Sequence, residues 1–79
     1  MATTGAYAIE AAMTGWDVLR NGERVANEST RDRARACAER MEQAERAYLA
    51  GETLDADLRC YLPEPLKARA LRDAGGMSR

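Results

Sequence analysis

Four side chains could act as nucleophiles, but the base that usually activates a nucleophile is missing. They are Ser29, Thr30, Cys37 and Cys60. The 79 residues include no histidine, which excludes His-based triads, histidine-ligated zinc and the usual proton shuttle at neutral pH. Ser29 and Thr30 stand where a helix needs an N-cap, and both cysteines fall near apolar stripes. We therefore expect no enzymatic activity.

Carboxylates, thiols and glycines offer further kinds of chemistry. Asp55 and Asp57 could form an acid–base pair or hold Mg²⁺, but they stand at the start of an expected helix, where the helix dipole favours acids. Cys37 and Cys60 are 23 residues apart and form no CxxC pair, so we expect reduced thiols and no zinc site. The glycines occur at turns and helix ends rather than in a phosphate-binding loop. No metal and no other cofactor is expected.

The charges balance overall but are uneven along the chain. Twelve basic and 13 acidic residues give a net charge of −1, whereas nucleic-acid binders are normally far more basic. Residues 58–79 carry 5 basic and 2 acidic side chains. This end therefore suggests an alternative function, nucleic-acid binding. The basic patch that would carry it consists of Arg59, Lys67, Arg69 and Arg72.

Asn21-Gly22 is the clearest local structural signal. Both residues tolerate the positive φ of a type I′ turn, so the sequence predicts a two-residue β-hairpin around them. The predicted register pairs Arg20 with Glu23, Leu19 with Arg24 and Val18 with Val25.

A second turn at Thr14-Gly15 connects an earlier segment to this hairpin. The segment from Tyr7 to Met13 is expected to add a third strand, and a short helix over residues 6–13 is the alternative. The three strands would then share one apolar face. The residues expected on that face are Tyr7, Ile9, Ala11, Met13, Trp16, Val18 and Val25.

A long amphipathic helix follows the hairpin. Ser29 or Thr30 can cap its N-terminus and Gly51 can end it, so we expect a helix over residues 30–50. Its apolar stripe is narrow and rich in alanine, which lets it lie close against the sheet. Its outward face carries charges of both signs that can pair along the helix, as on a solvated surface. These outward residues are Asp32, Arg35, Glu39, Glu42, Gln43 and Arg46.

Two shorter helices are expected after Gly51. Thr53 caps the first, which ends at Pro63 because the residue before a proline disfavours the α conformation. Pro65 stands at the first position of the second, which continues to Gly75-Gly76.

These elements predict an α+β fold in one small domain covering residues 1–79. A two- or three-stranded antiparallel sheet is packed by one long helix and followed by one or two short helices. The other face of the sheet is half apolar, so either the C-terminal helices or another molecule must cover it. The predicted core consists of Tyr7, Ile9, Met13, Trp16, Val18, Val25, Cys37, Met41 and Tyr48.

The order of the hairpin and the long helix along the chain is similar to that of other small proteins. Residues 14–50 contain Gly15-Trp16-Asp17-Val18, then Asn21-Gly22, then Thr30 at the start of an amphipathic helix. This order resembles the hairpin-then-helix unit of small bacterial and phage proteins. Compact proteins of this kind from phages and mobile elements include anti-CRISPR proteins. The resemblance implies non-enzymatic blocking of a larger protein or ribonucleoprotein of host defence. Many anti-CRISPR proteins use acidic surfaces, and the acidic candidates for partner binding are Glu39, Glu42, Asp55 and Asp57.

The leading hypothesis is therefore a small inhibitor or adaptor that acts on a larger bacterial complex. Nucleic-acid binding through the basic patch and a homodimeric scaffold are the alternatives. The uncharged stretch from Met1 to Ile9 is too short and too polar for a membrane span or a secretory signal. We expect no membrane partner and a cytoplasmic location, which is the host bacterial cytoplasm if the protein is phage-encoded.

Overall fold

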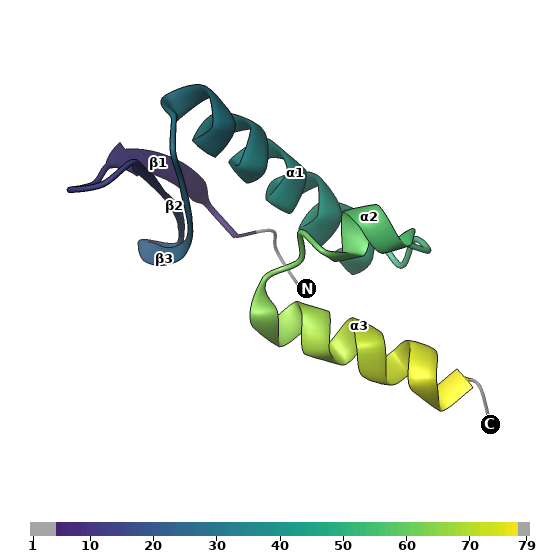
Figure 1. Ribbon diagram of the computed structural model, residues 1–79. Helices are drawn as coiled ribbons and strands as arrows, with labels where there is room; N and C mark the ends of the chain where they lie inside the picture. Colours follow the sequence, from purple (N-terminus) through teal and green to yellow (C-terminus); the bar gives the residue numbers. More distant parts are fainter. Residues whose placement is uncertain (1–4, 78–79) are drawn as a thin grey trace.

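The computed structural model describes residues 5–77. The fold is α+β, as predicted: β1 (Tyr7–Ala11), β2 (Trp16–Arg20) and β3 (Glu23–Glu28) form an antiparallel sheet in the order β1-β2-β3. The helices α1 (Arg31–Leu49), α2 (Ala56–Arg59) and α3 (Glu64–Met77) follow in the chain. Figure 1 shows α1 along one face of the sheet, α2 near the C-terminal end of α1, and α3 projecting from the rest of the molecule.

The segment before the Thr14-Gly15 turn is a strand rather than the alternative helix. β1 pairs with β2 in unbroken register, from Tyr7 opposite Arg20 to Ala11 opposite Trp16. Gly15 has a φ of +73°, and a Cβ there would collide with the backbone oxygen of Glu28. Only glycine fits this turn, because it tolerates positive φ and leaves room for the neighbouring strand.

The second hairpin keeps the predicted turn but not the whole predicted register. Arg20 pairs with Glu23 and Leu19 with Arg24, as predicted, but Val18 pairs with Ala26 rather than with Val25. The pairing shifts between Val18 and Leu19, so Val25 is the extra residue of a β-bulge. The bulge moves Ala26 onto the core face, whereas Val25 is 36% exposed.

The long helix lies where the sequence predicts it. The Thr30 hydroxyl accepts a hydrogen bond from the backbone N–H of Arg33 at 3.1 Å, so Thr30 rather than Ser29 is the N-cap. Gly51 follows the helix with a φ of +81°, in the left-handed conformation that commonly ends helices. One face of this helix packs on the sheet.

The two later helices begin at positions other than those predicted. Asp55, not Thr53, caps α2, because its carboxylate accepts the backbone N–H of Leu58 at 2.8 Å. The α2 helix ends at Arg59, several residues before Pro63. The α3 helix begins at Glu64, which makes Pro65 its second residue, and it runs through the two glycines to Met77.

The core lies between the sheet and α1. Val18, Ala34 and Met41 are buried at its centre. The half-buried residues packed against them are Tyr7, Ile9, Trp16, Ala26, Cys37 and Ala38. The prediction was wrong for Met13, which is fully exposed where the chain turns between β1 and β2, and for Val25, which the bulge turns away. Tyr48 is half-buried outside this cluster.

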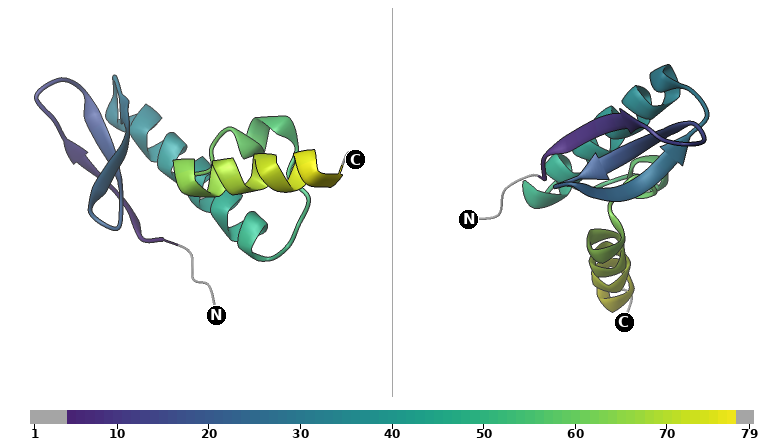
Figure 2. Two further views of the ribbon diagram at one scale, coloured as in Figure 1. Left: turned by 90° about the horizontal axis from the view of Figure 1, so that it is seen from below. Right: turned by 90° about the vertical axis from the view of Figure 1, so that its left-hand side faces the viewer.

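The described helices all lie on one side of the sheet. The left-hand view of Figure 2 shows the sheet at one end of the molecule, with α1 and then α3 on the same side of it. The opposite face, which carries Ala8 and Leu19, is not covered by the C-terminal helices. This outcome leaves another molecule as the possible cover for that face.

Candidate functional site

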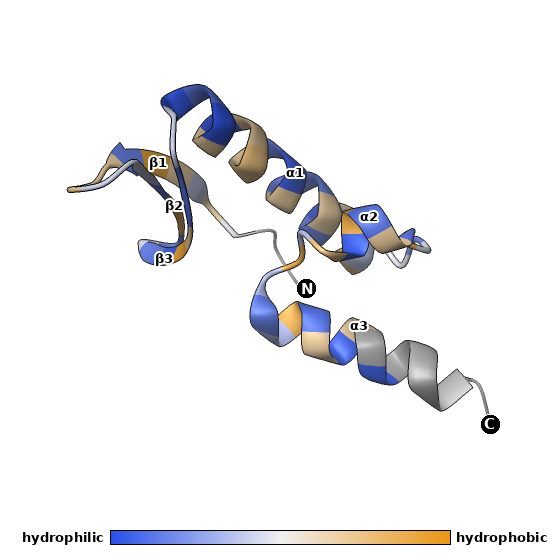
Figure 3. Ribbon diagram, viewed as in Figure 1, coloured by the Kyte–Doolittle hydropathy of each residue, from blue (hydrophilic) through white to orange (hydrophobic). Residues whose placement is uncertain are grey.

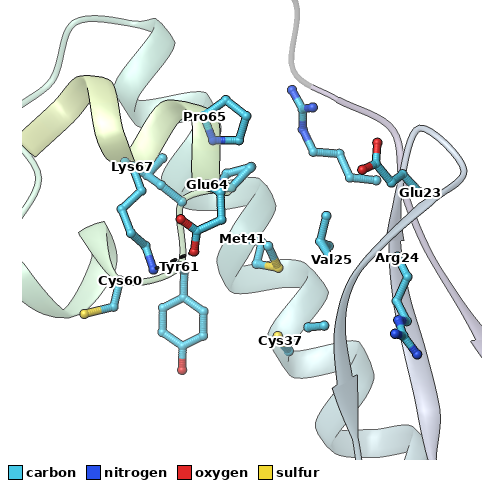
Figure 4. A pocket seen from close by; sticks show the side chains of 14 residues that line it. Glu23, Arg24, Val25, Cys37, Met41, Cys60, Tyr61, Glu64, Pro65 and Lys67 are labelled. Atoms are coloured by element: carbon cyan, nitrogen blue, oxygen red, sulfur yellow. Dashed lines mark ion pairs between the residues drawn. The ribbon is translucent and has the colours of Figure 1, made fainter.

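A groove of about 450 Å³ separates β3 from the segment that begins α3. Its walls come from the second hairpin, the middle of α1 and residues 60–67. Figure 4 shows Tyr61 and Lys67 on one side, Val25 and Arg24 on the other, and Met41 between them. We call this site the β3 groove. Its lining residues are Arg20, Glu23, Arg24, Val25, Ala26, Cys37, Met41, Cys60, Tyr61, Leu62, Pro63, Glu64, Pro65 and Lys67.

The β3 groove presents apolar side chains at its rim and at its base. Val25 and Tyr61 are each 36% exposed, from opposite walls. Met41 and Leu62, which also line the groove, are buried. Figure 3 shows hydrophobic residues, in orange, in the segment joining α2 to α3, which forms one of these walls. The β-bulge places Val25 here, so the departure from the predicted register builds part of the site.

The charged side chains at the rim of the groove form only long ion pairs. Lys67 lies 3.9 Å from Glu64, and Arg24 lies 3.9 Å from Asp17, in both cases nitrogen to oxygen. Arg24 is mostly exposed, and the Glu64 side chain is almost fully so. Contacts of this length that involve a largely exposed charged group contribute little to stability. These charges are therefore free to meet charges on a bound molecule.

Both cysteines line the β3 groove. Cys37 is half-buried and Cys60 is exposed, and both are free thiols. Burial, helped by the charge of Glu28, raises the pKa of Cys37 above its usual 9.0, which keeps it as a thiol. A protonated, half-buried cysteine acts as a small apolar side chain. Cys37 therefore adds to the apolar base of the groove.

Arg20 of the groove lining is bonded to Glu45, the one buried charged group among the described side chains. Glu45 has no exposed surface. Its carboxylate accepts hydrogen bonds from the N–H of Gly5 at 2.9 Å and the hydroxyl of Tyr7 at 2.7 Å. It also accepts two from the guanidinium of Arg20, at 2.9 and 2.7 Å. Glu45 therefore ties β1, β2 and the segment before β1 to α1.

The ionisation of this cluster follows from its contacts. The hydrogen bonds from Arg20, with those from Tyr7 and Gly5, lower the pKa of Glu45 to about 2 against the opposing effect of burial. Burial and the hydrogen bond to Glu45 raise the pKa of Tyr7 well above its usual 10.0. At neutral pH the carboxylate stays charged and the phenol neutral, so neither is suited to general acid–base work. The cluster positions the strands on the helix.

Sequence reasoning missed this cluster. The sequence pattern pairs Arg20 with Glu23 across the hairpin and gives no sign that Arg20 also reaches Glu45 on the long helix. A signal that Glu45 is buried was present, because Glu45 falls four residues after the buried Met41, on the apolar stripe of the helix. Arg20 likewise shares the inward face of β2 with Val18.

The four acidic candidates for partner binding are not brought together. Glu39 is exposed and Glu42 half-buried on α1, and both line a hollow beside β1. Asp55 is occupied as the N-cap of α2, and Asp57 is exposed in the first turn of that helix. None of the four lines the β3 groove.

The basic patch is likewise spread over two helices. Arg59 is half-buried in the last turn of α2, and Lys67 lines the β3 groove. Arg69 and Arg72 are exposed one turn apart on α3. Of the four, only Lys67 lines the β3 groove, and Arg69 and Arg72 are exposed farther along α3.

Residues 5–77 contain no helix long and apolar enough to cross a membrane. Among the side chains that the structure describes, no three acidic or cysteine groups are placed to share a metal ion. No protein-family model, curated protein or solved structure matches this chain.

Proposed function

We propose that the protein is a non-enzymatic binding module that holds an extended, largely apolar segment of a partner protein in the β3 groove. The observation that carries the proposal is the pair of partly exposed apolar side chains, Val25 and Tyr61, on opposite sides of this groove (Figure 4). Exposed apolar side chains gathered in a concave site are typical of interaction surfaces.

The lining of the groove favours an apolar segment with polar ends. Tyrosine is enriched among the residues that contribute most to protein interfaces, because it combines a large apolar area with a polar hydroxyl. Met41 and Cys37 line the groove between Tyr61 and Val25 (Figure 4), and methionine adapts its shape to irregular partners. Arg24 and Glu64 at the rim supply charges of both signs for the polar groups that flank an apolar segment.

A protein that binds in this way would act by occupying a surface of its partner. A small domain that occupies a surface of a larger complex blocks it or bridges it to another component, and it needs no chemistry of its own. Inhibition of a larger bacterial complex is the form of this activity that we propose. The resemblance in layout to anti-CRISPR proteins supports it, and the exposed free thiol of Cys60 suits a reducing compartment such as the cytoplasm.

The test is comparative affinity capture from a bacterial lysate, followed by mass spectrometry. The baits are the wild-type protein, Val25→Ser, Tyr61→Ser and the control Met13→Ser. Met13 is an exposed apolar residue outside the β3 groove, so its replacement removes similar apolar surface elsewhere. Circular dichroism verifies that all four proteins are folded.

We expect one partner protein to be captured by the wild type and by Met13→Ser, and to fall by about tenfold or more with Tyr61→Ser. Val25→Ser should reduce capture in the same direction. Equal capture by all four baits, or no enrichment by the wild type, would contradict the proposal. The partner that is identified then allows its activity to be measured with and without the protein, and unchanged activity would exclude inhibition.

A further inference from the structure

The two edges of the sheet differ in how open they are to another strand. β3 carries the bulge at Val25 and the charged residues Glu23, Arg24 and Glu28. Bulges and charges are devices that keep an edge from pairing. β1 pairs with β2 in unbroken register, and Glu10 is its charged residue. β1 is therefore the edge that can accept a further strand, on the side of the sheet away from α3 (Figure 2, right).

Alternate residues of β1 direct their backbone groups to this free edge. The carbonyl of Ala6 accepts the N–H of Asn21 at 2.8 Å, and the N–H of Ala12 donates to the carbonyl of Gly15 at 3.1 Å. The even-numbered residues therefore face β2, and the odd-numbered ones face away from it. The residues of β1 with backbone N–H and carbonyl groups on the free edge are Tyr7, Ile9 and Ala11.

A hollow of about 230 Å³ runs beside this edge, between β1 and α1. We call it the β1 hollow. The charges along its α1 side are segregated by sign: Arg31 and Arg35 come first, and Glu39 and Glu42 follow. Its lining residues are Tyr7, Ala8, Ile9, Arg31, Arg35, Ala38, Glu39 and Glu42.

The two elements that form the β1 hollow run in opposite directions. Tyr7, at the start of β1, is bonded to Glu45 near the end of α1. Trp16, which pairs with the last residue of β1, lies under the guanidinium of Arg31 at the start of α1, at 5.9 Å from carbon to ring centre. The basic end of the hollow therefore lies beside Ala11, and the acidic end lies beside Tyr7.

We propose that this edge is the interface of a homodimer, in which β1 pairs with β1 of a second copy. The copies are antiparallel about a two-fold axis at Ile9, the middle residue of the free edge. Ile9 then exchanges backbone hydrogen bonds with its own counterpart, and Tyr7 does so with Ala11 of the second copy. The two three-stranded sheets become one continuous sheet.

The charges of the β1 hollow are self-complementary under this two-fold axis. Rotation brings the basic half of one hollow against the acidic half of the other, so Arg35 of each copy meets Glu39 and Glu42 of the second copy. Glu42 already has a loose contact with Arg46 at 3.6 Å, which leaves the more exposed Glu39 as the main new partner. An interface that uses the same patch on both copies requires this kind of self-complementarity. A parallel neighbour would place like charges together.

The test is the mass of the protein in solution, measured by sedimentation equilibrium at low salt. We expect a mass twice the 8.7 kDa of one chain. Ala11→Pro removes a backbone N–H from the free edge, at an exposed position where an edge strand tolerates proline. This variant should be monomeric while keeping the circular dichroism of the wild type.

Charge reversal provides a second test that does not depend on the strand. Arg35→Glu should weaken the dimer by about tenfold or more, because it places like charges together twice across the axis. Adding Glu39→Arg and Glu42→Arg to the same chain should restore the dimer. Arg40→Glu is the matched control, since Arg40 is exposed on α1 but does not line the β1 hollow.

Two results would overturn the inference. The first is a monomeric wild-type protein at chain concentrations up to about 1 mM, where even weak specific association is populated. The second is a dimer that neither Ala11→Pro nor Arg35→Glu weakens, because such a dimer uses another surface. The β3 groove lies at the other edge of the sheet, so these outcomes are independent of the proposed function.

Discussion

At the scale of single residues, the cluster around Glu45 is the most consequential feature. A buried carboxylate is stable only when its charge is paired and its oxygens accept hydrogen bonds. Arg20, Tyr7 and Gly5 meet both requirements. The residue pattern could have indicated this, since Glu45 and Arg20 both fall on inward faces. It could not have indicated that the two side chains meet, because that depends on how α1 crosses the sheet.

Removing one member of this pair should cost far more than removing both. Arg20→Leu leaves the Glu45 carboxylate buried without its cation, which should lower the free energy of unfolding by about 3–5 kcal/mol. The double variant Arg20→Leu, Glu45→Leu should recover most of that loss. Urea unfolding of the two single variants and the double variant measures the difference. Additive losses in the double variant would show that the two side chains are not coupled.

The same cluster predicts a loss of stability in acid. The folded-state pKa of Glu45 is about 2, below its ordinary value of 4.5. Its contribution to stability is therefore complete above pH 4.5 and is lost as the pH falls toward 2. Glu45→Gln should lower stability at pH 7 and flatten its dependence on pH between 4.5 and 2. Unfolding curves across that range provide the measurement, and an equal slope in both proteins would refute the assignment.

At the scale of elements, the turns and caps were predictable and their fine positions were not. Asn21-Gly22, Gly51 and the long helix follow from local backbone preferences. The β-bulge at Val25 does not, because it depends on what β3 packs against. Asp55 caps α2 in place of Thr53, and both residue types are good caps. The β3 groove was unpredictable for the same reason, since its walls come from separate elements.

Ser29 and Thr30 are equivalent candidates for the N-cap of α1 by sequence alone, but their structural roles differ. Thr30→Ala removes the acceptor for the N–H of Arg33 and should cost about 1 kcal/mol of stability. Ser29→Ala should change stability by less than about half of that, because Ser29 is exposed outside the cap. Thermal unfolding of both variants makes the comparison. A larger loss for Ser29→Ala would reverse the assignment of the cap.

At the scale of the whole molecule, the chain places three different surfaces in different directions. The β3 groove opens at one edge of the sheet, the β1 hollow at the other, and α3 extends away from both. The α+β class could be predicted, because it follows from the order of the elements. These surfaces could not, because each forms where residues distant in sequence meet.

The exposed arginines of α3 allow the alternative function to be tested directly. Arg69 and Arg72 lie one turn apart, but the chain as a whole carries a net charge of −1. We therefore expect no measurable binding of DNA or RNA in titrations at about 50 mM salt, where electrostatic binding is strong. Binding that is lost in Arg69→Glu, Arg72→Glu would instead favour a nucleic-acid-binding protein.

Photo-cross-linking from inside the β3 groove, in bacterial cells, measures directly whether this groove binds a partner protein. A photoreactive phenylalanine analogue replaces Tyr61 in one protein and Met13, outside the groove, in the control. We expect an adduct with a different protein from position 61 and none from position 13. No adduct from position 61, an adduct with a second copy of this chain there, or the same adduct from both positions would contradict it.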